Sequence, residues 1–429
     1  QKSYTDSIKI RRMPFPDQIV LPMRQHAGRP AIPLVKPGER VERADKVGEA
    51  DGFISVPIHT SAAGTVRDVT LWPHPDGSMA ESGVVEVDRW SPQGPRPRIV
   101  AQWEGPEPDQ VGKEVQKAGV VGRGGAAFPT HVKLLPPKDM PVHTLIVNGA
   151  ECEPYLTTDH RTMVEFPERV QFGIRIMMKA LGVEKAIIGV EKNKPDAIER
   201  LRDTLPDDLD VTVLPLTVKY PQCAEKMFIE VFTGSEVPSG KLPMNVGVVV
   251  QNVGSIACNA EIFETGQPLI ERVVTVTGPG VRRPSNLLVP VGTRLRDVLE
   301  FCDGLTDDAS QIIFGGPMMG AATPDLDTPL IKGTTGVVVL TEAQARPPTV
   351  YPCIHCGRCL ESCPVFLNPS LLGSLAQAGR YEEMEDSHLM DCMLCGSCSY
   401  VCPSHIPLSQ MFALGKNMLR RVKSKESAA

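Results

Sequence analysis

The pattern of apolar and polar positions changes character twice along the chain. Up to about residue 100 it contains no amphipathic helix, and short apolar stretches alternate with polar positions and turn residues. The run Lys36–Glu39 predicts a turn before a strand at Arg40–Val41, and Gly52–Val69 alternates around a turn at Gly64. Short strands at this spacing indicate a small β sandwich.

From about residue 108, helical and strand-like stretches alternate. Five helices are predicted, over residues 108–118, 166–181, 195–205, 222–232 and 252–265. Four strands are predicted, over residues 144–148, 185–190, 211–216 and 246–250. Strands that alternate with helices of this length are typical of βαβ units around a parallel sheet.

A compact module of a different kind is predicted between about residues 270 and 325. Strands are expected over 272–276, 285–289 and 311–314, with a turn at Gly278–Gly280 and a helix over 295–301. That order resembles a β-grasp module.

Two helical stretches are expected near the C-terminus. Pro369–Met390 places several apolar side chains on one face, and the chain after Pro407 is again helical. The second helix ends in a basic group: Lys416, Arg420, Arg421, Lys423 and Lys425. Two interpretations of this group stay open, namely a solvated helix end and contact with an acidic partner or a lipid surface.

The first hundred residues resemble the hammerhead fold of biotinyl and lipoyl carrier domains. Those carriers present a modified lysine at the tip of a hairpin, and Gly52–Val69 contains no lysine. We therefore expect a scaffold or docking surface here, with a carrier as the weaker alternative.

Composition places the chain among ordinary globular proteins. Its 429 residues are 41% hydrophobic and 22% charged, which provides enough apolar surface for a sizeable core. The net charge of −6 argues against nucleic acid as a partner. No stretch approaches about 18 consecutive apolar residues, so no segment is expected to span a bilayer. The chain starts at Gln1 without an initiator Met or a cleavable signal pattern, so we expect a few residues to precede it.

Cysteine is the compositional anomaly. Eight of the twelve cysteines form two runs with one spacing, Cys-x-x-Cys-x-x-Cys-x-x-x-Cys-Pro, from Cys353 to Pro364 and from Cys392 to Pro403. Disulfides would need an oxidising compartment, and nothing directs export. Structural zinc usually takes two separated Cys-x-x-Cys pairs and has no use for a third thiol at this spacing. Zinc and disulfides therefore remain minor alternatives to iron–sulfur clusters.

Three thiolates spaced two apart can bind three iron corners of a cubane cluster from one loop. In the bacterial two-cluster arrangement, the fourth cysteine of each run binds the other cluster. We assign one [4Fe–4S] cluster to Cys353, Cys356, Cys359 and Cys402. The second is assigned to Cys392, Cys395, Cys398 and Cys363. Two clusters crossed in this way suit one-electron transfer.

A glycine-rich loop follows the first predicted helix of the α/β region. Gly122-Arg123-Gly124-Gly125 lets backbone amides approach an anion, and Arg123 and Lys133 add positive charge for a phosphate. Tight turns also use glycine, so this loop by itself favours ligand binding only moderately.

Two further polar loops follow predicted strands. Asn148-Gly149-Ala150-Glu151-Cys152-Glu153-Pro154 comes after one strand, and Gln251-Asn252 comes after another and opens a helix. Ligands of open α/β sheets bind beyond the carboxyl ends of the strands. The carboxylates there can accept hydrogen bonds from ribose or ribityl hydroxyls. Three such loops together with two clusters suggest a flavin that supplies electrons to iron–sulfur centres.

At this point the chain resembles a known family over essentially its full length. The glycine loop through Lys133 and the Asn148–Tyr155 segment are similar to the flavin- and NADH-binding subunit of respiratory complex I. The complete order of modules resembles more closely the RnfC proteins of Rnf complexes, the membrane-bound NADH:ferredoxin oxidoreductases of bacteria. The complex I protein has one cluster and lacks the hammerhead, so it is the poorer match.

The resemblance implies an α/β chain with added modules. A hammerhead or barrel-sandwich β domain is expected over 1–105 and a Rossmann-like FMN/NADH domain over 106–268. A β-grasp domain of the SLBB type is expected over 269–340. A helical, ferredoxin-like two-cluster domain with the basic C-terminal helix is expected over 341–429.

The resemblance also implies the roles of individual residues. FMN is expected to be bound by one set of residues: Gly122, Arg123, Gly124, Gly125, Lys133, Asn148, Glu151, Glu225, Gln251 and Asn252. Phe128 is expected to stack near the adenine or nicotinamide of NADH, and Glu153 to contact NADH, with Lys133 beside them in the catalytic group. One departure is Cys223-Ala224, which stands where the family usually has Gly-Gly; Glu225 and Lys226 are kept.

The expected activity is hydride transfer from NADH to FMN and passage of single electrons through the two clusters. By resemblance the partners are the other Rnf-type membrane subunits and a ferredoxin-type iron–sulfur subunit, with ferredoxin or flavodoxin as acceptor or donor. The expected location is peripheral, at the cytoplasmic face of the bacterial inner membrane. Two alternatives are an electron-wiring subunit without NADH oxidation, which Cys223-Ala224 favours, and a soluble hydrogenase or formate-dehydrogenase diaphorase, which the paired cysteine runs contradict.

Overall fold

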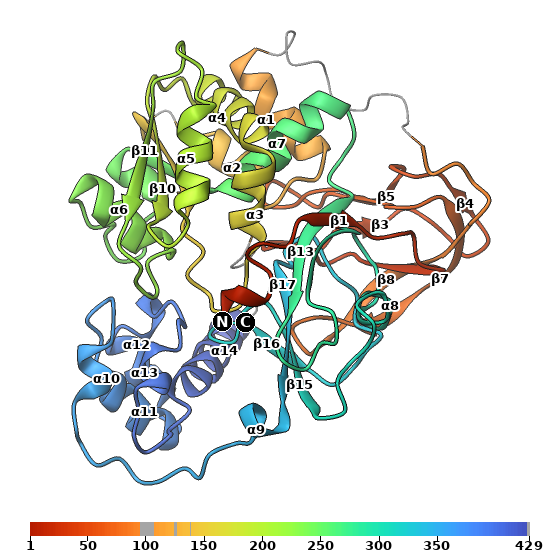
Figure 1. Cartoon of the computed structure of the whole chain (residues 1–429). Helices are drawn as coiled ribbons and strands as arrows, with labels where there is room; N and C mark the ends of the chain where they lie inside the picture. The colour runs from red at the N-terminus through yellow and green to blue at the C-terminus, as the bar shows by residue number, and fades with distance from the viewer. Residues whose placement is uncertain (95–106, 124–126, 138, 427–429) are drawn as a thin grey trace. The chain divides into compact units, whose positions relative to one another are not determined.

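The chain folds into two compact units, shown in the computed structural model of Figure 1. The structure describes residues 1–94, 107–123, 127–137 and 139–426. The first unit comprises Gln1–Val218 and Pro243–Ala345, and the second comprises Lys219–Leu242 and Arg346–Ala429. Each unit is described by itself below.

The N-terminal part of the first unit is a β sandwich. One sheet has the order β2-β8-β7-β4 and the other β3-β5-β6. Their bounds are β2 Gln18–Pro22, β3 Ile32–Pro33, β4 Arg40–Val41, β5 Lys46–Glu49, β6 Ile58–His59, β7 Gly64–Pro73 and β8 Met79–Val87. The buried core contains Ile19, Leu21, Val47 and Val85, which the alternating pattern directs inward. The expected β sandwich is thus confirmed.

The middle of the first unit is a four-stranded parallel sheet with the order β11-β10-β9-β12. The strands are β9 Thr144–Gly149, β10 Ala186–Glu191, β11 Val211–Leu216 and β12 Val248–Asn252. Their helices in this unit are α1 Pro108–Lys117, α2 Thr130–Leu134, α3 Thr158–Glu165, α4 Pro167–Leu181, α5 Pro195–Asp203 and α7 Val253–Thr265, with a 3-10 turn η2 at Pro243–Val246. Most of β9 and β12 is buried, as expected for near-continuous apolar strands of a parallel sheet.

The third part of the first unit is a six-stranded mixed sheet with the order β1-β14-β13-β17-β15-β16. Its elements are β13 Glu271–Thr277, β14 Ser285–Pro290, α8 Leu295–Phe301, β15 Ala309–Phe314, β16 Ala321–Thr323, β17 Gly336–Thr341 and the short helix α9 Glu342–Ala345. The strands and helix expected of a β-grasp module are all present. One edge strand, β1 (Ile10–Arg12), comes from the N-terminus, after the 3-10 turn η1 (Lys2–Tyr4).

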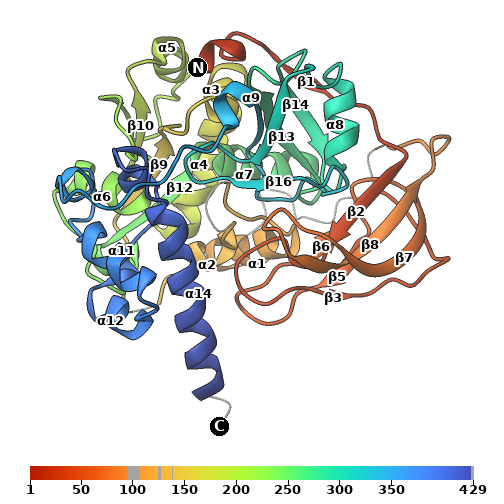
Figure 2. The ribbon, with the colours of Figure 1, turned by 90° about the horizontal axis from the view of Figure 1, so that it is seen from below.

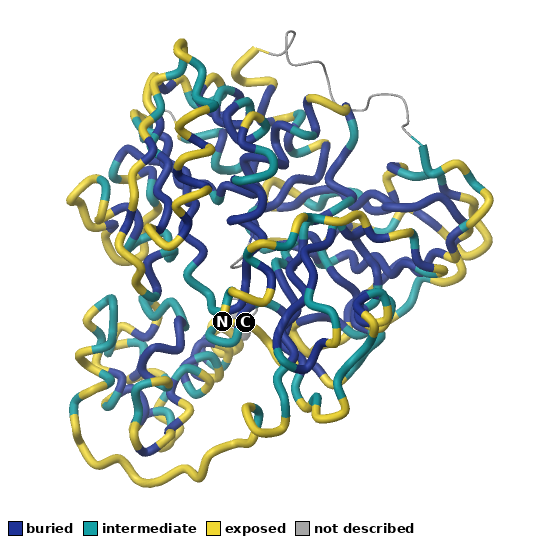
Figure 3. The backbone as a smooth tube through the Cα atoms, viewed as in Figure 1, coloured by how far each residue is buried: buried dark blue, intermediate teal, exposed yellow. Residues whose placement is uncertain are grey.

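The second unit is helical. Its elements are α6 Glu225–Thr233, α10 Arg358–Glu361, α11 Pro369–Gln377, α12 Tyr381–Asp386, η3 Leu389–Asp391, α13 Ser397–Tyr400 and α14 Leu408–Glu426. The long helix α14 packs against α11 and α12 through a core that includes Leu372, Met384 and Phe412 (Figure 2). Residues 346–356, which lead into the first cysteine run, are exposed (Figure 3).

Two expected helical stretches are present with different bounds, and two helices were not predicted. Pro369–Met390 is not one helix, because the chain turns at Gly379, with φ +68°, and at His388, with φ +61°. The predicted helix 222–232 starts only at Glu225 and belongs to the second unit. Helices α2 and α3 were not predicted; α3 is short and buries polar side chains, so it carries no apolar stripe.

No helix of the described residues is both long enough and apolar enough to cross a membrane.

Candidate functional site

Two of the expected FMN residues lie side by side in the parallel sheet. Asn148 of β9 and Asn252 of β12 are direct partners in the register of the two strands. From β9 the connections lead to β10 on one side, while β12 lies on the other side. The strand order therefore reverses between β9 and β12, which is where open α/β sheets bind ligands.

Asn252 organises this end of the sheet. Its side-chain oxygen caps α7 by accepting hydrogen bonds from the backbone amides of Gly254 (2.8 Å) and Ser255 (3.2 Å). Its Nδ2 donates to Asp159 Oδ2 over 2.6 Å. Burial and the neighbouring Glu151 carboxylate raise the pKa of Asp159 to about 6.

Glu151 is held at the start of α3. It accepts hydrogen bonds from the Thr158 hydroxyl (3.0 Å) and the backbone amide of Asp159 (2.9 Å), and it lies 3.7 Å from Lys2 Nζ. Burial alone would raise the pKa of Glu151, but Lys2 and the buried Lys194 outweigh it and lower this pKa. Glu151 is therefore an anion at neutral pH.

Several buried polar atoms at this end of the sheet have no hydrogen-bond partner in the described part of the chain. They are Gln251 Nε2, Arg123 Nε and Asp159 Oδ1. An unpaired buried polar atom costs about 1–3 kcal/mol, so each of these groups calls for a partner such as a bound polar molecule, an ion or water. The described residues thus fit a ligand rich in hydroxyl and amide groups, such as FMN.

The glycine loop is closed at its base. Val121 and Pro129 form an antiparallel bridge, and the Gly122 amide donates to the Phe128 carbonyl over 2.8 Å. Ala127 adopts the left-handed conformation with φ +49°. Gly124 and Gly125, two expected FMN residues, lie outside the described residues.

The two cations of this segment bind backbone carbonyls. Arg123 donates from Nη2 to Val273 O over 2.9 Å and lies 3.8 Å from Asp159. Lys133, on α2, donates from Nζ to Val250 O over 2.9 Å, which places it on β12 one residue before Gln251. Lys133 and Gln251 are thus brought together.

Two buried cations that were not predicted lie beneath the same loop. Lys332 Nζ donates to Gly119 O (2.8 Å) and Pro57 O (2.9 Å), and Arg272 Nη2 lies 3.5 Å from Gly122 O. Burial lowers the pKa of Lys332 to about 7 and that of Arg272 to about 9. At neutral pH Arg272 is thus a cation and Lys332 is only partly protonated, and the charge of Arg272 suits the cradle of an anionic group. Both residues lie in the β-grasp part of the sequence, far from the loop, which explains why spacing arguments missed them.

Glu153, expected to contact NADH, is occupied by a loop of the β-grasp module. Its carboxylate accepts hydrogen bonds from the backbone amides of Met318 (3.1 Å) and Met319 (2.9 Å). Burial raises the pKa of Glu153, although these two bonds partly offset it. The two amides therefore fix the orientation of the Glu153 carboxylate. Its contact with NADH stays a prediction.

Glu225, the last expected FMN residue, is the first residue of α6 in the second unit. In that unit the preceding Tyr220 hydroxyl donates to the carbonyl of Cys395 over 2.6 Å. The segment that carries the family motif therefore packs on a cysteine run.

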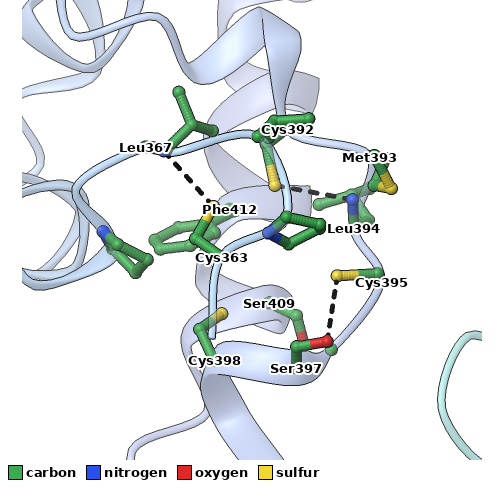
Figure 4. Close-up of a pocket in the computed structure, with 14 residues that line it drawn as sticks. Cys363, Leu367, Cys392, Met393, Leu394, Cys395, Ser397, Cys398, Ser409 and Phe412 are labelled. Carbon is green, nitrogen blue, oxygen red and sulfur yellow. Dashed lines mark hydrogen bonds between the residues drawn. The ribbon is translucent and has the colours of Figure 1, made fainter. Parts of the chain in front are cut away.

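The second set of cysteines lines one cavity. Cys363 of the first run lies there with Cys392, Cys395 and Cys398 of the second run (Figure 4). The remaining lining is largely apolar and includes Leu367, Met393 and Phe412. The crossed set of four thiols is thus brought together by the fold.

The first set is less enclosed. Cys353 and Cys356 are exposed, and both influence the pKa of Cys359, which burial raises. Two hydrogen bonds hold the segment after Cys402 beside the start of this run. The carbonyl of Ser404 accepts from the amide of Tyr351 (2.9 Å), and Ser404 Oγ donates to the carbonyl of Pro352 (2.9 Å).

The two runs have the same backbone conformation. In each, the amide of the residue two after the first cysteine donates to its sulfur over 3.4 Å: His355 to Cys353, and Leu394 to Cys392. These donors have φ +55° and +56°, and the following glycines have φ +77° and +79°. Amides that point at sulfur stabilise thiolate ligands and tune cluster potentials.

The thiols of the cavity fit a positively charged inorganic group. Burial and the neighbouring sulfurs of Cys392 and Cys395 raise the pKa of Cys398 to about 12. Four thiolates in one apolar cavity repel one another, so they need metal charge between them. Across the described residues, no three His, Cys, Asp or Glu side chains converge as they would on one metal ion. The four thiols that line the cavity are the donor type that a [4Fe–4S] cluster requires.

Four family models match successive parts of the chain. They are the RnfC barrel sandwich hybrid domain over residues 1–90, the Nuo51 FMN-binding domain over 115–260, the SLBB domain over 273–322 and the 4Fe-4S dicluster domain over 349–406. Their order agrees with the order of folded parts, and the expected fold class is confirmed.

Full-length relatives decide the family. The chain is 44% identical over 394 residues to the C component of a proton-translocating ferredoxin:NAD(+) oxidoreductase complex from Clostridium ljungdahlii, covering 91% of this chain and 85% of the relative. It is 39% identical over 433 residues to the C component of an ion-translocating oxidoreductase complex from Rhodobacter capsulatus, covering 99% and 82%. The chain belongs to the RnfC family. A relative in Acetobacterium woodii, 43% identical over 88% of this chain and 85% of its own length, is named as the Na(+)-translocating form.

A solved structure supports the fold of this RnfC-family chain. An NAD+-reducing [NiFe]-hydrogenase in the H2-reduced state superposes with a TM-score of 0.50 at 21% identity, covering 75% of this chain and 62% of the other.

Proposed function

We propose that this chain is the electron-input subunit of a membrane-bound, Rnf-type NADH:ferredoxin oxidoreductase. Electrons from NADH pass through FMN and two [4Fe–4S] clusters toward ferredoxin or flavodoxin, or in the reverse direction. Ion translocation is carried out by the other Rnf-type membrane subunits, and a ferredoxin-type iron–sulfur subunit receives the electrons. The chain is placed peripherally, at the cytoplasmic face of the bacterial inner membrane.

One observation carries this proposal: buried polar side chains at the switch point of a parallel sheet and a crossed set of four thiols occur in one chain. Neither alone specifies the function. Together they supply a place for a two-electron carrier and a place for a one-electron carrier, which NADH-dependent electron transfer to ferredoxin requires.

The chain's own residues supply binding and orientation. FMN, when bound, accepts a hydride from NADH and releases electrons singly. Among the residues that would hold it, Gln251 has an unpaired buried amide nitrogen, and Asn148 and Asn252 lie side by side at the ends of β9 and β12. The buried Arg272 lies 3.5 Å from the Gly122 carbonyl at the start of the glycine loop. The anionic Glu151 can accept hydrogen bonds from ribityl hydroxyls.

The eight cysteine thiols of the two runs would hold the clusters. Cys353, Cys356, Cys359 and Cys402 would hold one cluster, and Cys392, Cys395, Cys398 and Cys363 the other. Apolar side chains such as Leu367 and Phe412 exclude water from the second set, which influences its reduction potential.

Anaerobically purified protein tests the proposal by its composition and activity. We expect about eight iron atoms per chain, from two cubanes, and one FMN, together with NADH-dependent reduction of a one-electron dye. About one iron, or stoichiometric zinc, would exclude the cluster assignment. An electron-wiring role, which Cys223-Ala224 favours, predicts full iron content and no NADH-dependent dye reduction after FMN reconstitution.

A further inference from the structure

The two cysteine runs are alike in backbone but unlike in surroundings. Cys353 and Cys356 of the first run are exposed, whereas Cys395 and Cys398 of the second run are buried. Enclosure in an apolar cavity disfavours the extra negative charge that a cluster gains on reduction, so the second site by itself would be the harder one to reduce.

A lysine lies against the enclosed run. Lys416 of α14 is only 8% exposed, and its Nζ donates to the carbonyls of Cys392 (2.5 Å) and Met390 (3.1 Å). The sequence pattern placed Lys416 in a basic helix end, solvated or facing a partner, and this expectation was wrong for Lys416. Lys423, seven residues later, pairs with Glu385 at the surface.

At the position equivalent to Lys416, the described part of the first run has no lysine. Helices α11 and α14 both start six residues after the fourth cysteine of their run, and counting from that cysteine places Gln377 where the second run has Lys416. Gln377 is exposed and uncharged. The ammonium group is therefore a specific feature of the enclosed site.

The inserted segment Lys219–Leu242 further closes the second run. Tyr220 donates to Cys395 O (2.6 Å), Ser239 donates to Asp391 (2.6 Å), and Lys226 lies 3.7 Å from Asp391. Asp391 thus neutralises Lys226, while the two partners of Lys416 are uncharged carbonyls. The two hydrogen-bond partners of Lys416 thus carry no charge, although Asp391 lies close enough to interact with it electrostatically.

We propose that Lys416 selectively raises the reduction potential of the cluster held by Cys392, Cys395, Cys398 and Cys363, offsetting the enclosure of that site. The inference rests on the proposed function for the presence of the clusters. One electron that enters this site adds one negative charge, makes or breaks no bond, and leaves to the next carrier. Lys416 touches no reacting atom and acts as an electrostatic and positioning residue.

The test is an EPR-monitored redox titration of the full holo chain. Lys416→Met removes the charge and both hydrogen bonds, Lys416→Gln removes the charge but keeps a donor, and Lys416→Arg keeps the charge. Lys423→Met removes the same charge from the exposed part of α14. A Cys395→Ser variant identifies the second-site signal as the one that it changes.

We expect Lys416→Met and Lys416→Gln to lower the second-site midpoint potential only, with iron content unchanged. Lys416→Arg should restore it, and Lys423→Met should leave both potentials in place. Unchanged potentials in Lys416→Gln, or equal shifts of both signals, would overturn the inference. Loss of four irons in both neutral variants would also overturn it, since Lys416 would then hold the fold of the site. Absence of cluster signals from the unmodified chain would instead refute the proposed function.

Discussion

Asn252 and Asp159 form a 2.6 Å hydrogen bond between the end of β12 and the first turn of α3. This bond joins a residue predicted from sequence to one that was missed. It also involves a buried carboxyl group whose charge depends on pH.

Replacement of Asp159 by Asn should change how stability depends on pH. Burial and Glu151 raise the pKa of Asp159 to about 6, so the folded FMN-free chain keeps this proton longer than the unfolded chain does. Ionisation of the native carboxyl therefore lowers the free energy of unfolding as pH rises from about 4 through about 6, by at most about 3 kcal/mol. We expect the melting temperature of Asp159→Asn, relative to the unmodified chain, to be higher at pH 8 than at pH 5.

Asp203→Asn, at an exposed position of α5, is the control for Asp159→Asn and should show no such difference between the two pH values. A melting-temperature difference for Asp159→Asn that is equal at pH 5 and pH 8 would contradict the assignment.

Asn252 should both cap α7 and contribute to FMN binding. Asn252→Ala removes the helix cap, at a cost of about 1 kcal/mol, and also the amide that donates to Asp159 beside the expected flavin residues. Asn252→Ser keeps a capping oxygen but has no amide. We expect FMN affinity, measured by flavin fluorescence, to fall at least about tenfold in both variants, since about 1.4 kcal/mol is a factor of ten.

Only Asn252→Ala should also lower the melting temperature without FMN. Wild-type FMN affinity in Asn252→Ser would show that Asn252 acts only as a helix cap.

The crossed ligation can be tested with one cysteine from each run. Cys363 belongs to the first run by sequence but lines the cavity of the second. We expect Cys363→Ser to alter the EPR signal that Cys395→Ser also alters, and Cys402→Ser to alter the other signal. If Cys363→Ser instead affects the same signal as Cys356→Ser, each run binds its own cluster and the crossed assignment is wrong.

The absence of a side chain at Gly316 should be required for the position of the Glu153 carboxylate. A Cβ at Gly316 would lie 2.2 Å from Glu153 Oε2, so Gly316→Ala must displace the carboxylate. If Glu153 contacts NADH from its present position, Gly316→Ala and Glu153→Gln should both raise the KM for NADH several-fold at unchanged FMN content.

Gly94→Ala is the matched control for Gly316→Ala, because its added methyl meets nothing closer than 3.8 Å. A normal KM in Gly316→Ala, with a raised one in Glu153→Gln, would show that the loop does not position the carboxylate.

Local sequence signals were sufficient for the elements and for the thiols. The strands β9 to β11 and the helices α1, α4, α5 and α7 follow from apolar period alone, and the cysteine spacing selected the four thiols that share a cavity. The elements depend on residues that are close together in the chain. The grouping of the thiols follows from a cysteine spacing that indicates which cysteines bind the same cluster.

Long-range contacts were not predictable in the same way. Lys2 reaches Glu151, and Arg272 and Lys332 lie beneath a loop some 150 to 210 residues earlier. Nothing in the local pattern distinguishes these buried cations from solvated ones. Lys416 is a further example. Its basic helix end was expected to face water or a partner, but Lys416 itself is buried against the carbonyls of Met390 and Cys392.

The discontinuity of the second unit limits how such proteins can exchange parts. Its two segments, Lys219–Leu242 and Arg346–Ala429, are separated by more than a hundred residues that fold elsewhere. A chimera that swaps only the C-terminal segment with a relative would pair a foreign cysteine run with the host's Tyr220, Lys226 and Ser239. Recombination of the electron-transfer part is therefore expected to succeed only when both segments come from one parent, so these two stretches should be inherited together.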